Sequence, residues 1–304
     1  MINNVTIIGS GLMGHGIALK FAQFGFGVTV FDPNEGSLNT LFDRINRSLS
    51  QMSVPASKIK KILSSITKSS KLLESVQTAE LIIEAVPEKL ELKQKIFKEI
   101  ETLSNSKCIF ASNTSVIPIT KIVEKMHDKS RALGTHWWNP PHLIPLVEVI
   151  RTKWTDEKHI LMTIDVLNKI DKTPVRVEKD VPGFIGNRLQ HALWREAISL
   201  VENGVCDAKS VDTVIKSSFG RRLSVLGPLE NADLVGTDLT LDVHENVLYD
   251  LESSNKPSKL LKNLVKSGKL GMKSGEGFQR WDNKDLEQIK LKISKFLSEL
   301  EKII

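Results

Sequence analysis

Two ionisable side chains, His136 and Glu148, lie in sequence surroundings that suit acid–base chemistry. His136 precedes a Trp- and Pro-rich stretch, and Glu148 interrupts the otherwise apolar run 146–150. A histidine titrates near neutral pH, so it suits a base that takes an alcohol proton while hydride leaves for a cofactor. A lone acid in a buried strand is costly unless it is paired, and a carboxylate on the second ring nitrogen would fix the tautomer. We therefore predict a His136–Glu148 pair; the alternative is a structural histidine and an acid that faces water.

Ser115 and Asn187 supply polar groups at two further points of the chain. Ser115 ends the stretch 111–115, which directly follows an apolar run, and Asn187 lies among small residues at the start of a helical stretch. Open α/β sheets bind ligands at the carboxyl ends of their strands. We expect Ser115 at that edge, with the Asn187 amide bound to the substrate or to Ser115; an ordinary cap or surface amide is the alternative. The histidine spacings do not match a metal site, so no metal is expected.

Three glycines, Gly9, Gly11 and Gly14, form a GxGxxG pattern between an apolar β-branched run and a helical stretch. The first permits a tight turn, the second lets the backbone approach a pyrophosphate, and the third allows close packing of helix on strand. Asp32 follows 18 residues after Gly14, at the end of a second expected strand. Its carboxylate would accept hydrogen bonds from the adenosine ribose and repel a 2′-phosphate. NAD is therefore favoured over NADP, although FAD-binding proteins share the pattern and a chance glycine turn is possible.

The elements that would position these residues alternate along the first 182 residues. Short apolar runs typical of buried strands are separated by stretches with helical spacing, which predicts a doubly wound, mainly parallel sheet. After Gly183 the apolar residues recur only at helical spacing, and Asp207 is an expected helix N-cap. We expect an α/β domain over 1–182 and an all-helical domain over 183–304. The expected strands are 5–8, 28–31, 81–86, 108–111, 131–134, 147–150 and 175–177, and the expected helices between them include 34–50, 57–66, 88–102 and 117–126.

Composition restricts the class of protein. The chain has 304 residues, a net charge of +6, 40% hydrophobic residues and one Tyr. Its lysines are scattered, whereas a nucleic-acid binder usually concentrates basic and aromatic residues, so no nucleic-acid partner is expected. No apolar run reaches the roughly 18–20 residues of a membrane span, and the chain passes from Met1 directly into an apolar run, which predicts no membrane association and no signal peptide. The two cysteines lack CxxC spacing and fit a cytoplasmic protein.

These stretches together resemble the 3-hydroxyacyl-CoA dehydrogenase family over essentially the whole chain. The resemblance lies in Gly9–Gly16, Ser112–Ser115, His136–Ile150, Asp180–Leu189 and Gly268–Phe278. The 21-residue step from Ser115 to His136 and the 12-residue step from His136 to Glu148 also agree with it. The resemblance implies a Rossmann-type domain followed by a helical domain that forms a homodimer, with the active site in the cleft between the two domains.

The resemblance also implies roles for individual residues. His136 would be the general base, Glu148 its orienting partner, and Ser115 and Asn187 the groups that bind the 3-oxygen of the substrate. Ser48 would lie in the helical pair that holds CoA. The residues implied for binding NAD are Gly9, Gly11, Leu12, Met13, Gly14, Asp32, Ala85, Val86, Glu88, Lys93, Asn113, Ser115 and Asn139.

The substrate is where the chain departs from the family pattern. Trp137 and Trp138 stand where short-chain CoA enzymes usually carry Phe, and Pro55 replaces an expected lysine, although Lys58, Lys60 and Lys61 could bind CoA phosphates. The sequence Asn139–Glu148 is closer to the L-gulonate 3-dehydrogenase (lambda-crystallin) and carnitine dehydrogenase branch. We favour a short-chain L-3-hydroxyacyl-CoA as substrate. A free 3-hydroxy acid is the first alternative, and a non-catalytic, NAD-binding crystallin-like protein is the second.

Overall fold

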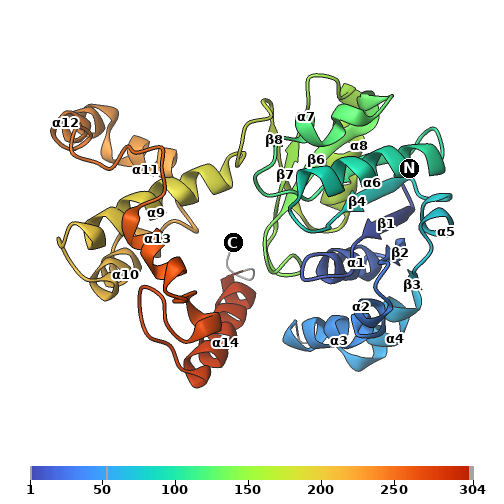
Figure 1. The fold of residues 1–304 in the computed structure, drawn as a ribbon, viewed down its shortest axis with the longest axis horizontal. Helices are drawn as coiled ribbons and strands as arrows, with labels where there is room; N and C mark the ends of the chain where they lie inside the picture. Colours follow the sequence, from blue (N-terminus) through green and yellow to red (C-terminus); the bar gives the residue numbers. More distant parts are fainter. Residues whose placement is uncertain (1, 53, 301–304) are drawn as a thin grey trace. The chain divides into compact units, whose positions relative to one another are not determined.

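The computed structural model describes residues 2–52 and 54–300, which divide into two compact units (Figure 1). The first unit ends at Arg188 and the second begins at Leu189. The expected domain border after residue 182 lies close to this division. That the two parts are independent domains stays a prediction. In the described part of the chain no helix is long and apolar enough to cross a membrane. The cytoplasmic location also stays a prediction.

The first unit is built on one sheet. Over residues 2–52 and 54–300 the sheet has eight strands in the order β3-β2-β1-β4-β5-β6-β7-β8, and only the β6–β7 pair is antiparallel. The strand order reverses between β1 and β4, which is where a doubly wound sheet binds its ligand. The expected fold class is therefore confirmed. The strands are β1 (Asn4–Ile8), β2 (Gly27–Phe31), β3 (Ile66–Ser69), β4 (Leu81–Glu84), β5 (Ile109–Ser112), β6 (Ala132–Trp137), β7 (Leu146–Ile150) and β8 (Thr173–Val177).

Helices cover both faces of this sheet (Figure 1). Successive residues of β1 point to opposite sides, so Ile7 joins one apolar cluster and Ile8 the other. The first cluster includes α1, α3 and α8, and the second includes α5, α6 and α7. A strand buried on both faces must be apolar throughout, which is why the strands were recognisable in the sequence. The helices are α1 (Gly14–Gln23), α2 (Glu35–Asn39), α3 (Leu41–Gln51), α4 (Ala56–Ser64), α5 (Leu72–Val76), α6 (Leu90–Leu103), α7 (Ile119–Ile122) and α8 (Glu157–Lys169).

Four elements, β3, α5, α7 and α8, differ from the sequence-based expectation. β3 is not among the expected strands: the expected helix 57–66 includes only its first residue, and among its four residues only Ile66 is buried. The helices α5 and α8 were not predicted. The expected helix over 117–126 is a single α-helical turn, α7, followed by a 3₁₀ turn over Val123–Lys125.

The second unit is helical, as predicted. It contains most of α9 (Gly186–Glu202), followed by α10 (Ala208–Ser217), α11 (Pro228–Val235), α12 (Thr237–Val247), α13 (Lys259–Lys266) and α14 (Asn283–Leu300). Asp207 caps α10 as expected, and its carboxylate accepts a hydrogen bond of 2.7 Å from the Ser210 amide. Among the side chains described in this unit, none is buried.

The loop between β6 and β7 packs tightly on the start of α1. A Cβ at Gly16 would lie 2.6 Å from Cγ of Pro141, so the loop and the helix touch at this glycine. His142 is only 6% exposed, and its Nε2 lies 3.4 Å from Oε1 of Gln51. Burial, together with the nearby positive charges of His15, Lys172 and Lys20, lowers the pKa of His142 to about 4. The folded protein therefore contains a neutral imidazole at this position.

His142 should make stability depend on pH in the mildly acidic range. Its folded pKa of about 4 lies below the usual 6.5, so the stabilisation is complete above pH 6.5 and is lost as pH falls toward 4. Between pH 7 and 5 this corresponds to about 2 kcal/mol. We expect His142→Gln to reduce the fall in unfolding free energy over this interval by that amount, measured by urea denaturation. Replacement of the exposed His127 by Gln should leave the pH dependence unchanged. An identical pH dependence in His142→Gln and the parent protein would contradict the prediction.

Candidate active site

His136 and Glu148 form the predicted pair. They lie directly opposite each other in the antiparallel β6–β7 ladder, and Nδ1 of His136 is 2.6 Å from Oε2 of Glu148. Both side chains are buried, with 4% and 1% of their surfaces exposed. Burial raises the pKa of Glu148, but hydrogen bonds from His136 and from the Gly186 and Ile185 amides outweigh it and hold that pKa below its usual value. Because an ionised carboxylate only accepts, Nδ1 carries the hydrogen, and Nε2 presents a lone pair that can take a proton.

The chain that returns from β8 covers this pair. Oε1 of Glu148 accepts hydrogen bonds from the amides of Ile185 at 2.8 Å and Gly186 at 3.0 Å. Both amides follow Phe184, whose φ of 51° is a left-handed conformation that costs free energy for a bulky residue. The strained turn places the Phe184 ring 5.6 Å from the His136 ring. The imidazole also contacts Trp138, with ring centroids 5.4 Å apart, so aromatic groups surround it.

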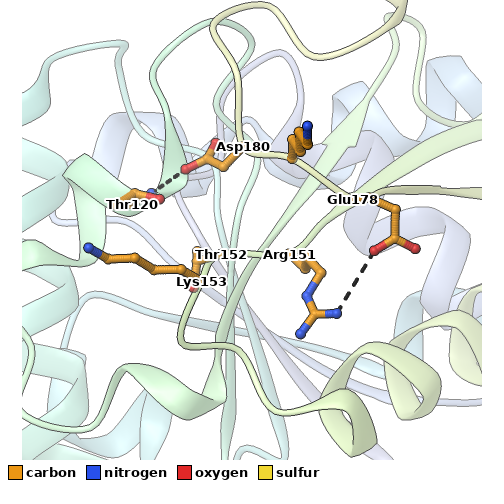
Figure 2. A pocket seen from close by; sticks show the side chains of 7 residues that line it. Thr120, Arg151, Thr152, Lys153, Glu178 and Asp180 are labelled. Carbon is orange, nitrogen blue, oxygen red and sulfur yellow. Dashed lines mark hydrogen bonds and ion pairs between the residues drawn. The ribbon is translucent and has the colours of Figure 1, made fainter.

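Asp180 ties the same return segment to α7. Its two carboxylate oxygens accept from the amides of Ile119 at 3.0 Å and Thr120 at 2.6 Å, and Figure 2 shows Asp180 directed toward Thr120. A pocket of about 370 Å³ opens beside this contact. Its lining residues, Thr120, Arg151, Thr152, Lys153, Glu178, Lys179 and Asp180, include none of the four predicted catalytic residues.

Ser115 and Asn187 are brought together as predicted. Nδ2 of Asn187, in the first turn of α9, donates a hydrogen bond of 2.9 Å to the backbone oxygen of Ser115, which follows β5. The bond uses the Ser115 peptide and not its hydroxyl. Ser115 is exposed, so its hydroxyl lies at the surface of the first unit, where a ligand can reach it.

The glycine turn has the geometry of a dinucleotide-binding turn. A Cβ at Gly14 would lie 1.8 Å from the oxygen of Gly9, so no other residue fits at this helix start. Gly9 has a φ of 103°, and a Cβ there would lie 2.7 Å from the oxygen of Ala85. A Cβ at Gly11, in contrast, would meet nothing within 4 Å. The turn is therefore packed on its inner side and open at Gly11, as the approach of a pyrophosphate requires.

Asp32 is held beside this turn by three hydrogen bonds. Oδ2 accepts from the amide and the hydroxyl of Ser10 at 2.9 and 2.8 Å, and Oδ1 accepts from the Asn34 amide at 2.9 Å. Asp32 remains partly exposed at the end of β2. Its fixed negative charge fits a ribose diol and disfavours a 2′-phosphate, so the residues present fit NAD.

Glu84, which the sequence analysis missed, joins the two predicted cofactor residues Glu88 and Lys93. Glu84 is fully buried at the end of β4, and its Oε1 lies 2.7 Å from Nζ of Lys93. Nζ is also 3.2 Å from Oε2 of Glu88. The signal was present in the sequence, because Glu84 is a lone acid in an apolar strand, as Glu148 is.

Three other predicted residues lie in different surroundings. Asn113 is buried, and its Oδ1 accepts a 2.9 Å bond from the Trp137 amide. Asn139 is exposed and precedes a cis peptide bond to Pro140. Ser48 is 4% exposed, with its Oγ 3.4 Å from Nε2 of His15, whose Nδ1 is 3.0 Å from the Gly11 oxygen. Their ligand-binding roles, like those of Leu12, Met13 and Val86, stay predictions. No group of metal-binding side chains occurs among the described residues.

Comparison with known families gives two matches. The family described as the NAD binding domain of 3-hydroxyacyl-CoA dehydrogenase matches residues 4–181, and the one described as the C-terminal domain of that enzyme matches residues 183–281. Together the two matches cover most of the chain, and they meet close to residue 182.

Individual proteins resemble the chain over nearly its full length. A 5-formyl-3-hydroxy-2-methylpyridine 4-carboxylate 5-dehydrogenase from Mesorhizobium japonicum is 34% identical, over 91% of this chain and 90% of the relative. A probable 3-hydroxybutyryl-CoA dehydrogenase from Bacillus subtilis is 35% identical, over 93% and 99%. The crystal structure of a 5-formyl-3-hydroxy-2-methylpyridine 4-carboxylic acid 5-dehydrogenase, described as an NAD⁺ dependent dismutase, has a TM-score of 0.92 and 31% identity over 100% of this chain and 98% of that one.

Replacement of Glu148 by Gln tests the role of the buried pair. The amide keeps the size of the side chain but removes the charge that stabilises an imidazolium at His136. We expect kcat for NADH formation to fall by about 100-fold or more, with the acidic limb of the pH–rate profile displaced to lower pH. Steady-state rates between pH 6 and 10 measure both effects. Glu99→Gln, an exposed change on α6, is the control. A normal kcat with an unaltered acidic limb would show that the pair is only structural.

Proposed function

The chain belongs to the 3-hydroxyacyl-CoA dehydrogenase family, and we propose that it oxidises a short-chain L-3-hydroxyacyl-CoA to the 3-ketoacyl-CoA. The family assignment makes it an NAD-dependent oxidoreductase. The observation that carries the proposal is the buried His136–Glu148 pair, with Nδ1 bound to a carboxylate and Nε2 left to act as a base. The non-catalytic alternative has no need for such a pair, because an ionised carboxylate buried for structure alone is a net cost.

Each residue of the site has a separate role in the proposed oxidation of an alcohol. NAD, held by the glycine turn at Gly9–Gly14 and by Asp32, would supply the acceptor for the hydride. Nε2 of His136 takes the hydroxyl proton, and Glu148 stabilises the imidazolium that forms. Ser115 and Asn187 bind the 3-oxygen of the substrate. The Trp138 and Phe184 rings limit access of water to the imidazole, which strengthens the His136–Glu148 interaction.

A free hydroxy acid is a second candidate substrate, and the surroundings of Ser48 favour it. This residue was expected to contact CoA, yet it is buried against His15, and Pro55 precedes α4 where a lysine was expected. A relative from Mesorhizobium japonicum is named for a pyridine carboxylate, which carries no CoA. The exposed side chains of Lys58, Lys60 and Lys61 on α4 support the CoA thioester instead, because they can contact phosphates.

A substrate panel distinguishes these candidates. We expect NADH formation at pH 9 with L-3-hydroxybutyryl-CoA to exceed that with L-gulonate and L-carnitine by at least about 10-fold in kcat/KM, because thioester binding energy is available only to the first. A higher kcat/KM for either free acid would replace the thioester by the second candidate.

His136→Ala tests the base directly. We expect kcat to fall by at least about 100-fold, since proton transfer loses its acceptor, while NAD binding followed by protein fluorescence stays within about 2-fold. His127→Ala, on the surface, should have normal kinetics. An active His136→Ala variant would remove His136 from the mechanism, whichever substrate is used.

We also propose that the protein is a homodimer formed through the second unit. Large apolar side chains are exposed there, among them Leu229 at 80%, Leu234 at 72% and Tyr249 at 83%. Exposed apolar surface of this extent is typical of a partner interface. Light scattering at micromolar concentration should give about twice the chain mass of 34.0 kDa. A mass of one chain over the whole accessible concentration range would contradict the proposal.

A further inference from the structure

Glu84 is a buried charge that connects three elements at the centre of the sheet. It lies at the end of β4, beside the point where the strand order reverses, and none of its surface is exposed. Oε1 accepts from Nζ of Lys93 at 2.7 Å and from the Val86 amide at 2.8 Å, and Oε2 accepts from the Ser112 hydroxyl at 2.6 Å. The carboxylate therefore ties the end of β4 to the end of β5 and to α6.

The ammonium group of Lys93 is buried and contacts two carboxylates and a backbone oxygen. Only 1% of its side chain is exposed, and its ammonium contacts Glu84 at 2.7 Å, Glu88 at 3.2 Å and the oxygen of Val86 at 3.3 Å. An ammonium has three hydrogens, so these three acceptors account for all of its donors. In this arrangement Lys93 joins two carboxylates.

Glu88 carries this connection to Ser115. Its Oε1 accepts from the hydroxyl of Thr114 at 2.5 Å and from the amides of Ser115 at 3.0 Å and Val116 at 3.2 Å. Burial raises the pKa of Glu88, but the Thr114 hydroxyl, the Lys93 charge and the Ser115 amide together hold it below its usual value. A carboxylate thus binds the amide side of Ser115, while Asn187 binds its carbonyl oxygen at 2.9 Å.

We propose that Glu84 is a positioning residue for Ser115, acting through the chain Glu84–Lys93–Glu88. The inference rests on the proposed function in one respect, namely that Ser115 binds the 3-oxygen of the substrate. Without the Glu84 charge, Lys93 keeps a single carboxylate partner, Glu88, which is 38% exposed. Lys93 and Glu88 then move relative to β4, and the Ser115 amide loses its fixed acceptor. A displacement of about 1 Å in a group that orients the substrate can cost about 100-fold in rate.

A double-mutant cycle with Ser115 tests this chain of contacts. We expect Glu84→Gln to lower kcat by about 10-fold, with a smaller change in KM for NAD, because Glu84 is fully buried and acts through its contacts to Lys93, Val86 and Ser112. In the Ser115→Ala background the same substitution should change kcat by less than about 2-fold, since the group it positions has been removed. Lys98→Gln, an exposed change on α6, is the matched control and should act in neither background.

The possible results separate the positioning role from the proposed function. If Glu84→Gln lowers kcat equally in both backgrounds, or lowers only the melting temperature, Glu84 is structural and the inference is overturned. If Ser115→Ala alone has normal kinetics, the oxygen-binding role of Ser115 fails, and the positioning role fails with it. If Glu84→Gln does not fold, Ser112→Ala removes the hydroxyl that donates to Glu84, together with the 3.2 Å bond that this hydroxyl accepts from the Thr114 amide, and retains all three charges. Its expected 3-fold or greater loss of kcat should likewise vanish in the Ser115→Ala background.

Discussion

An ionised carboxylate buried away from water must be supplied with donors, and this requirement at Glu148 shapes the proposed site. The donors come from separate segments, namely His136 on β6 and the amides of Ile185 and Gly186 after β8. The antiparallel direction of β7 places Glu148 opposite His136. The left-handed turn at Phe184 delivers the two amides. Removing one partner of such a group costs several kcal/mol in typical proteins, so these three segments are held in one arrangement.

The same requirement recurs at the centre of the sheet. Glu84 is buried at the end of β4 and takes its donors from Lys93, Ser112 and the Val86 amide. Both buried carboxylates are connected to Ser115 by short routes, one through Glu88 and one through the start of α9, where Asn187 follows the Gly186 amide. The exposed Ser115 is thus connected on one side to Glu84 on β4 and on the other side to Glu148 on β7. Rigid strands that support an exposed loop residue are a common way to orient a substrate.

The cofactor end and the substrate end of the first unit differ in how firmly the residues define their ligand. At the glycine turn, the close contacts at Gly9 and Gly14, the open space at Gly11 and the fixed Asp32 carboxylate all agree with NAD. Around Ser48 the structure instead shows a buried hydroxyl beside His15. Burial and the nearby charges of Arg44 and Arg47 lower the pKa of His15.

Sequence alone determined the parts of this protein that follow from local chemistry and periodicity. The GxGxxG turn, Asp32, the buried strands and the Asp207 cap were identifiable because each depends on residues close together in the chain. The His136–Glu148 pair was predictable because a lone acid in an apolar strand requires a partner. Glu84 carries the same signal, a lone acid in an apolar strand that is paired in the fold, whereas the partly apolar pattern of β3 does not distinguish it as a strand.

Only the tertiary structure decided which distant groups meet. Three such contacts join residues up to 38 positions apart. They are the pairing of the antiparallel strand β7 with β6, the hydrogen bonds from the Ile185 and Gly186 amides to Glu148, and the burial of Ser48 against His15. No local pattern encodes these contacts, because strand direction and loop path are set by packing of the whole sheet.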